Sequence, residues 1–123
     1  MWERHSGTNN SDLILRMFKA IDSHDWVALE DIYHHDAVYE RGGYVPFVGV
    51  NAIMEFYRTA RVLATGEHRL DRIVTEDSCS ACWGRFEGRK KNGADVNVMF
   101  ADVYRVESGK IIFRRSHFFV ALV

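Results

Sequence analysis

The segment 95–106 constrains the fold more than any other part of the chain, because its apolar residues recur at every second position. Side chains alternate between the two faces of a β-strand, so the even-numbered residues of this segment share one face. That face consists of Val96, Val98, Phe100, Asp102, Tyr104 and Val106. The pattern predicts one long strand with a single apolar face, and such a face needs a second layer of structure to cover it.

Asp102 is the charged residue on that face. A carboxylate among apolar side chains is costly to bury, so it is usually hydrogen-bonded, neutralised or placed at a pocket. A carboxyl group whose pKa is raised by desolvation is suited to acid–base catalysis. The alternative is a structural ion pair between Asp102 and an arginine of a neighbouring strand, and the spacing leaves both readings open.

Length, charge and cysteine content exclude several classes of protein. We expect residues 1–10 to form a flexible polar tail without a signal peptide, and residues 11–123 to form a single domain. The formal net charge of −1 gives no field that would favour nucleic acid, and no apolar run approaches the ~20 residues of a membrane helix. Cys79 and Cys82 make no secreted disulfide framework, so a cytoplasmic location is expected.

Periodicity predicts helices in the first half of the chain and strands in the second. Ser11 or Asp12, Asp25 and Asn51 are suitable N-caps for three helices. The predicted helices start at 11 or 12, run over 26–33 and run from 52 to about 63, and the predicted strands cover 37–41, 67–74, 79–87, 95–106 and 111–120. This order predicts an α+β fold, a cone-shaped curved antiparallel sheet wrapped around three N-terminal helices, with an enclosed pocket toward which Asp102 points.

Several local motifs, in this order, resemble the nuclear transport factor two-like superfamily of cone folds. They are Asp22-Ser-His-Asp25, His35-Asp-Ala-Val-Tyr39, Val48-Gly-Val-Asn-Ala-Ile-Met-Glu-Phe-Tyr57 and Phe100-Ala-Asp-Val-Tyr-Arg-Val106. The resemblance extends from about Leu13 to Phe118 and implies the same cystatin-like α+β barrel. It implies no single reaction, because the superfamily contains several.

The ketosteroid isomerases of this superfamily place an aspartic acid where Asp102 stands. Their oxyanion tyrosine would fall near Met17 and their general-base aspartate near Arg41, so the resemblance argues against ketosteroid isomerisation. The limonene epoxide hydrolases have a second aspartate that would fall at Ser116, so their acidic pair is missing as well.

The SnoaL-like polyketide cyclases are a closer match. They use one cavity aspartate for acid–base chemistry, at the position resembling Asp102. Epoxide hydrolases of polyether pathways and pyran-forming cyclases use two carboxylates, and here Glu40 and Glu67 are the candidates for the second. Glu40 is favoured, because it precedes the Gly42-Gly43 loop that should rim the mouth of the cone.

The resemblance and the alternation of the strands together predict the residues that line the pocket. Arg114 and Ser116 share a face of the last strand, where Arg114 could pair with Asp102 or bind an enolate or a carboxylate. Of the adjacent pair Glu67 and His68, only one can face inward. The predicted lining comprises Met17, Tyr39, Arg41, Phe56, Tyr57, His68, Phe86, Phe100, Tyr104, Arg114, Ser116 and Phe118. Its aromatic content suits an apolar, polycyclic or polyene substrate.

No metal or organic cofactor is expected. His34, His35 and Asp36 have the composition of a two-histidine, one-carboxylate metal site, but consecutive residues in a turn do not converge easily on one ion. Cys79 and Cys82 should face opposite sides of a strand. There is no glycine-rich phosphate loop.

The sequence thus predicts a small cofactor-independent enzyme that acts on an apolar oxygenated metabolite such as a polyketide intermediate. The reaction would be cyclisation, isomerisation or epoxide opening by carboxylate acid–base chemistry. The alternative is a non-catalytic module of the same fold that binds a small molecule or dimerises. A homodimer is expected through the outer face of the sheet, where Met99, Ala101 and Val103 are too apolar to be left bare.

Overall fold

The computed structural model describes the backbone of residues 5–120 and the side chains of residues 10–120. The helical elements are α1 (His5–Asp22), α2 (Trp26–Ile32), α3 (Val50–Glu55) and a π-helical turn, η1 (Phe56–Ala60). The strands are β1 (Tyr33–Arg41), β2 (Phe47–Val48), β3 (Leu63–Glu76), β4 (Cys79–Lys90), β5 (Asp95–Glu107) and β6 (Lys110–Phe118). Among the described residues, no helix has the length and apolar character to cross a membrane.

The strands form one curved sheet in the order β2-β1-β6-β5-β4-β3. Strands β3 to β6 are an antiparallel meander, as predicted, and β1 pairs with β6 in parallel. The sheet is therefore mixed, and the expectation of a wholly antiparallel sheet was wrong at β1. The physical reason is that β1 and β6 are far apart in the sequence. No hairpin turn joins them, so no turn fixes the direction of β1 relative to β6. The α+β cone itself is confirmed.

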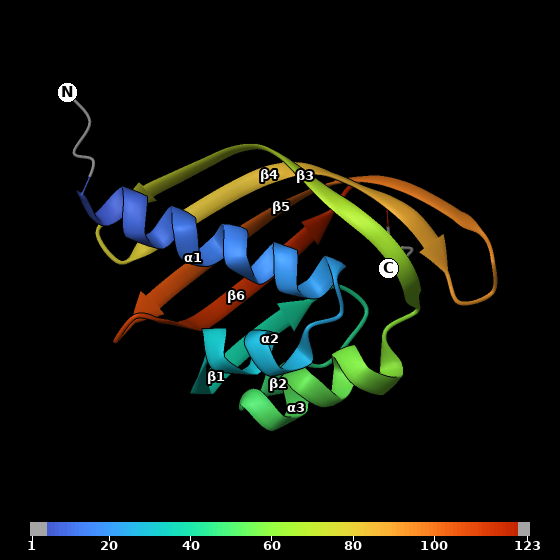
Figure 1. The fold of residues 1–123 in the computed structure, drawn as a ribbon, viewed down its shortest axis with the longest axis horizontal. Helices are drawn as coiled ribbons and strands as arrows, with labels where there is room; N and C mark the ends of the chain where they lie inside the picture. The colour runs from blue at the N-terminus through green and yellow to red at the C-terminus, as the bar shows by residue number, and fades with distance from the viewer. Residues whose placement is uncertain (1–4, 121–123) are drawn as a thin grey trace.

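One face of the sheet is covered by α1, which lies along the inner side of the curve (Figure 1). Burial along β5 alternates strictly from Asp95 to Arg105, and the even-numbered residues point inward. The apolar stripe of α1 packs against them and comprises Leu13, Ile14, Met17, Phe18 and Ile21. The core therefore fills the space between the helix layer and the concave face.

Glycines allow β3 and β4 to bend around the interior. A Cβ on Gly66 would lie 2.1 Å from the ring of Phe86, and one on Gly84 would lie 2.1 Å from the carbonyl oxygen of Arg69. The pairing of β3 and β4 also shifts register between Leu70 and Arg72. Close approach at glycine together with an irregular register bends a strand pair, and here it closes the cone over α1.

Two of the predicted helix boundaries differ from the structure. The first helix begins at His5, not at Ser11 or Asp12, so part of the predicted tail is helical; residues 1–4 lie outside the described residues. At residue 10, Asn10 donates to the backbone oxygen of Asp77 at 3.1 Å and ties the helix to the β3–β4 turn. The third helix begins after Gly49 and becomes π-helical at Phe56.

Candidate functional site

Asp102 lies in the interior and forms an ion pair with Arg114. Its Oδ2 accepts hydrogen bonds from the Tyr104 hydroxyl at 2.7 Å and from Arg114 Nε at 3.0 Å, and it lies 2.9 Å from Arg114 Nη2. Asp102 is 1% exposed and Arg114 3% exposed. Asp102 Oδ1 has no hydrogen-bond partner among the described residues. The structure therefore contains the ion pair that the sequence offered as an alternative.

Arg114 connects Asp102 to the opposite side of the interior. Its Nη1 donates to the hydroxyls of Tyr57, at 2.7 Å, and Tyr33, at 3.1 Å. The guanidinium also lies 4.6 Å from the centre of the Tyr39 ring. Burial alone would lower the pKa of Arg114, but Asp102 and the tyrosines outweigh it and raise that pKa well above its usual value. Arg114 therefore stays charged and joins β1, η1, β5 and β6.

Tyr39 lies between two arginines. Its hydroxyl accepts a hydrogen bond from Arg41 Nη1 at 2.7 Å and shares another with Ser116 Oγ at 2.8 Å. Burial would raise the pKa of Tyr39, but Arg114 and Arg41 outweigh it and lower that pKa below the usual value for tyrosine. The phenol is therefore a better proton donor than an ordinary buried tyrosine.

His68 and Asp22 form a second polar pair at the end of α1. The distance from His68 Nδ1 to Asp22 Oδ1 is 2.6 Å, and the backbone N–H of His68 donates to Asp22 Oδ2 at 2.9 Å. The ring is packed against Phe18 and Phe86, with centroid distances of 4.6 and 4.8 Å. Burial lowers the pKa of His68, Asp22 raises it in part, and Arg61 lowers it further, so its pKa lies below the usual value.

A lowered pKa makes His68 neutral at neutral pH. The contact with Asp22 then assigns the proton to Nδ1, because a carboxylate can only accept. The other nitrogen, Nε2, carries the lone pair and has no hydrogen bond to a described residue. A neutral imidazole whose tautomer is held by a carboxylate is the arrangement of a general base.

His68 lines a small cavity between two apolar clusters of the interior. The cavity has a volume of about 10 Å³, close to what one water molecule needs. It is lined by Arg41, Tyr57, Arg61, Leu63, His68, Phe86, Val98, Phe100, Arg114 and Phe118. Arg61 is 5% exposed, and its Nε has no hydrogen-bond partner among the described residues. Its guanidinium lies over the rings of Tyr57, at 5.5 Å, and Phe86, at 5.7 Å.

With this fold and interior in place, the family model for the SnoaL-like domain matches residues 14–113. The chain belongs to the SnoaL-like domain family. A comparison with curated proteins finds no significant match.

Solved structures share the SnoaL-like fold at low sequence identity. A Jannaschia protein assigned as a SnoaL-like polyketide cyclase superposes with a TM-score of 0.85 at 14% identity, covering 97% of this chain and 92% of that one. An epoxide hydrolase of the limonene epoxide hydrolase type from Mycobacterium tuberculosis gives 0.82 at 18%, covering 93% and 85%. An NTF2-like protein from Burkholderia pseudomallei gives 0.82 at 17%, covering 89% and 90%. These likenesses establish the cone fold that the sequence predicted.

The residues predicted to line the pocket of this SnoaL-like domain all lie in the interior, in two layers. Those at the cavity are Arg41, Tyr57, His68, Phe86, Phe100, Arg114 and Phe118. Those packed in the core beyond it are Met17, Tyr39, Phe56, Tyr104 and Ser116. Among the described residues, the interior space that they line is this small cavity, because the aromatic side chains around it pack against one another.

The two glutamates proposed as a second carboxylate do not face the interior. Glu40 pairs with Arg115 at 2.7 Å, and its side chain is 36% exposed. Glu67 pairs with Arg69 at 3.0 Å, and its side chain is 64% exposed. Strand alternation is the reason: in β1 the inward positions are those of Tyr39 and Arg41, and in β3 the inward position is that of His68. The expectation that Glu40 or Glu67 points into the cone is corrected.

Two residues of the site, Asp22 and Arg61, were not predicted from the sequence. Asp22 was part of a quoted motif, but its contact with His68 joins residues 46 positions apart. Arg61 follows Tyr57 by four positions, the helical spacing that places two side chains on one face. That spacing was the available signal for Arg61, because Tyr57 had been assigned to the buried face.

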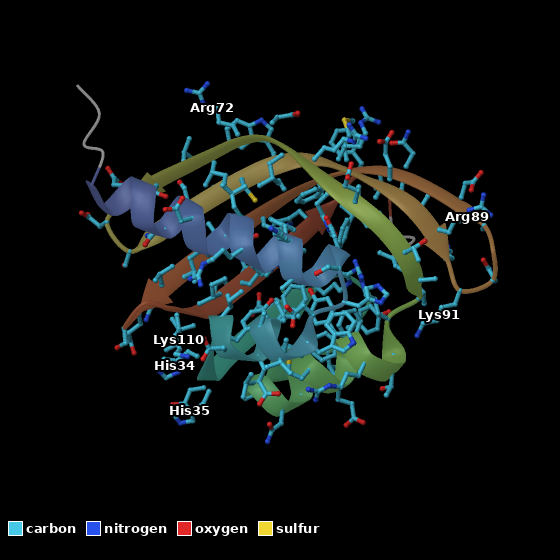
Figure 2. All side chains as sticks on the ribbon, in the orientation of Figure 1. His34, His35, Arg72, Arg89, Lys91 and Lys110 are labelled. Atoms are coloured by element: carbon cyan, nitrogen blue, oxygen red, sulfur yellow. The ribbon has the colours of Figure 1, made fainter. Side chains whose placement is uncertain are left out.

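His34, His35 and Asp36 lie closer together than expected. Their potential ligand atoms all fall within 4.8 Å of one another, so the expectation that they do not converge is corrected. Figure 2 shows His34 and His35 near Lys110, away from the interior. The two imidazole rings are stacked, with an interplanar angle of 21° and a centroid distance of 5.1 Å. His34 Nδ1 also accepts the backbone N–H of Asp36 at 3.0 Å.

Proposed function

We propose that this SnoaL-like protein is a small cofactor-independent enzyme in which His68, oriented by Asp22, is the general base. The observation that carries the proposal is the His68–Asp22 pair beside a cavity that also contains Arg61 and the Tyr57 hydroxyl. Nε2 would take a proton from an oxygenated substrate, and Arg61 would stabilise the negative oxygen that results. Cyclisation, isomerisation and epoxide opening all contain such a step.

The names of similar structures support this range of reactions, since one is assigned as a polyketide cyclase and another as an epoxide hydrolase. The substrate we propose is an oxygenated metabolite with an apolar body, such as a polyketide intermediate. The cavity has room for about one water molecule, so the interior has to open to admit that body. The reacting end of the substrate would enter the polar layer of the interior.

The proposal gives Asp102 a different role from the one expected from the sequence. Asp102 does not line the cavity, and its Oδ2 is engaged by Tyr104 and Arg114. We assign it to positioning, because it holds the guanidinium of Arg114 against the cavity. Catalysis by Asp102 itself is the competing assignment.

Proton exchange separates the two assignments without knowledge of the natural substrate. Deuterium incorporation at the α-carbon of a panel of cyclic ketones and 1,3-diketones is followed by NMR, and hydrolysis of a panel of epoxides by mass spectrometry. We expect His68→Gln to lower the rate by ~10²-fold or more, the usual size of a general-base contribution. His117→Gln, on the exposed outer side of β6, is the control and should leave the rate unchanged.

An unchanged rate in His68→Gln together with a loss in Asp102→Asn would return the catalytic role to Asp102. A wild-type protein without activity on either panel would favour the second candidate function.

The second candidate is a non-catalytic binding or dimerisation module. It is favoured by the small volume of the cavity and by the outer face of the sheet, where Trp83, Met99 and Val103 are 42%, 40% and 36% exposed. We propose that a homodimer forms through this face. Light scattering at micromolar concentration should give the mass of a dimer, and Val103→Asp should reduce it to that of a monomer. A wild-type monomer mass would contradict the dimer.

A further inference from the structure

We propose that the cavity beside Arg61 binds a carboxylate group, and that the substrate of this site is therefore a small carboxylic acid in its ionised form. The identification of the ligand as a substrate rests on the proposed function. The binding of a carboxylate does not, because it follows from the charge and geometry of the cavity alone.

Arg61 is the first observation. It is 5% exposed, and no hydrogen bond or ion pair links its side chain to another residue between positions 10 and 120. Its guanidinium lies over the faces of two aromatic rings, those of Tyr57 and Phe86. A buried guanidinium has five N–H donors, and leaving them without acceptors is costly. An anion in the cavity would supply the missing acceptors.

The backbone at Arg61 is the second observation. Residues Phe56–Ala60 form a π-helical turn, and the backbone N–H of Arg61 donates to the carbonyl oxygen of Phe56 at 2.9 Å. Isolated π-helical turns are rare and are often found at functional sites. The same turn directs the Tyr57 hydroxyl to Arg114 at 2.7 Å, and both Tyr57 and Arg61 line the cavity. The local backbone thus presents an arginine to an interior in which no described carboxylate pairs with it.

The distribution of acidic groups is the third observation. No carboxylate of a described residue lines the cavity. The two nearest to its lining residues are already engaged, since Asp102 Oδ2 binds Arg114 and both oxygens of Asp22 bind His68. The walls are largely aromatic and aliphatic, so water screens charges poorly there and the positive charge of Arg61 is felt strongly. Burial itself lowers the pKa of Arg61, and a bound anion would reverse that effect.

Charge and geometry favour a carboxylate among anions. The cavity holds about 10 Å³, room for one water molecule, so the interior has to open for any of these anions, and a carboxylate brings a single negative charge into apolar walls where a phosphate dianion would bring two. A guanidinium offers paired N–H donors that match the two oxygens of a carboxylate. His68 lines the same cavity as Arg61, so a carbon next to the carboxylate would lie near the proposed base.

Ligand titration by NMR tests the binding site directly. Formate, acetate and benzoate are the probes, and formamide, acetamide and benzamide are their neutral counterparts. We expect the carboxylates to shift the Arg61 Nε–H and His68 ring signals to a saturable end point, and the amides to cause no saturable shift. A bound anion should also raise the pKa of His68, because it offsets the positive charge of Arg61 that now lowers it.

Two variants assign the binding to Arg61. Arg61→Gln should weaken binding of acetate at least tenfold. Arg58→Gln is the matched control, because Arg58 lies on the same turn but is exposed and pairs with Glu30 at 3.2 Å; it should bind acetate as the wild type does. If Arg61→Gln does not fold, Arg61→Lys is the second variant. It keeps the positive charge but lacks the paired N–H donors of the guanidinium, so it should bind benzoate more weakly than the wild type.

Shifts that do not saturate in the wild type, or equal binding by the Arg61 and Arg58 variants, would overturn the inference. Carboxylate binding without any proton exchange would keep the anion site and remove the catalytic proposal. Proton exchange on neutral ketones without carboxylate binding would keep the catalytic proposal and remove the anion site. The two proposals can therefore fail separately.

Discussion

Two arginines in the same interior, Arg114 and Arg61, have opposite surroundings. Arg114 binds Asp102 and the hydroxyls of Tyr33 and Tyr57. Arg61 is buried to a similar degree, its guanidinium lies over the rings of Tyr57 and Phe86, and its Nε has no hydrogen-bond partner among the described residues. Both line the small cavity.

The difference distinguishes an arginine whose charge serves the structure from one whose charge is available to bind a ligand. The protein itself supplies everything Arg114 needs, so its charge is explained by the fold. Nothing in the described part of the chain balances Arg61, so the fold alone does not explain its charge. Removing each arginine in turn tests that contrast.

Removing Arg114 should cost the most stability. Arg114→Met leaves Asp102 buried without its cation, and breaking a buried ion pair in this way costs about 3–5 kcal/mol. Urea unfolding of the variant measures the loss. The control is Arg115→Met, next in sequence, because its ion pair with Glu40 is half-exposed and such pairs contribute at most about 1 kcal/mol. A loss in Arg114→Met no larger than in Arg115→Met would show that Asp102 does not depend on Arg114.

Removing Arg61 should cost little or increase stability. Arg61→Met replaces an unpaired buried cation by an apolar side chain of similar length, a change that should alter the free energy of unfolding by less than about 1 kcal/mol or raise it. The same urea experiment measures it. A loss as large as that of Arg114→Met would mean that Arg61 is structural, and the contrast between the two arginines would disappear.

His68 should make stability depend on pH below the ordinary pKa of histidine. Its pKa is lowered in the folded protein, so the unfolded chain takes up the proton first. The stabilising contribution of neutral His68 is therefore present above pH ~6.5 and is lost as the pH falls below that value. NMR titration of the ring should give a pKa below 6.5 in the folded state, and Asp22→Asn should lower it further. A His68 pKa above that of the unfolded chain would contradict the neutral base.

The smallest effect concerns the two thiols of β4, which lie on opposite faces. Cys79 is exposed, whereas burial raises the pKa of Cys82 to about 12. At pH 8 a thiol reagent should label only Cys79 in the native protein and both residues in urea, with no change in stability from Cys79→Ser. Rapid native labelling of Cys82 would show that the interior opens readily, which would also open a path to Arg61.

The sequence predicted the elements that depend on neighbours along the chain. Alternation gave β5 its inward face, and Asp25 caps α2 as expected, accepting from the backbone N–H of Ala28 at 3.2 Å. The turn between β4 and β5 also depends on neighbours along the chain, because its Asn92-Gly93 pair places Gly93 at a positive φ of 89°, a local signal for a hairpin. The polar partners could not be found in this way. Whether the Asp102 carboxylate pairs with an arginine or faces a pocket depends on which strand pairs with β5.

Local periodicity was therefore enough for the α+β cone, the inward position of Asp102 and the aromatic interior, because each of these depends on side chains a few positions apart. Tertiary structure alone decided the pairings Asp102–Arg114, 12 positions apart, and His68–Asp22, 46 positions apart. It also decided the parallel docking of β1 on β6, which turned Glu40 outward toward Arg115. A charge pattern indicates which groups need partners, but only the packed chain determines which of them obtain one. Among the described residues, Arg61 Nε and Asp102 Oδ1 are the buried side-chain atoms without a hydrogen-bond partner.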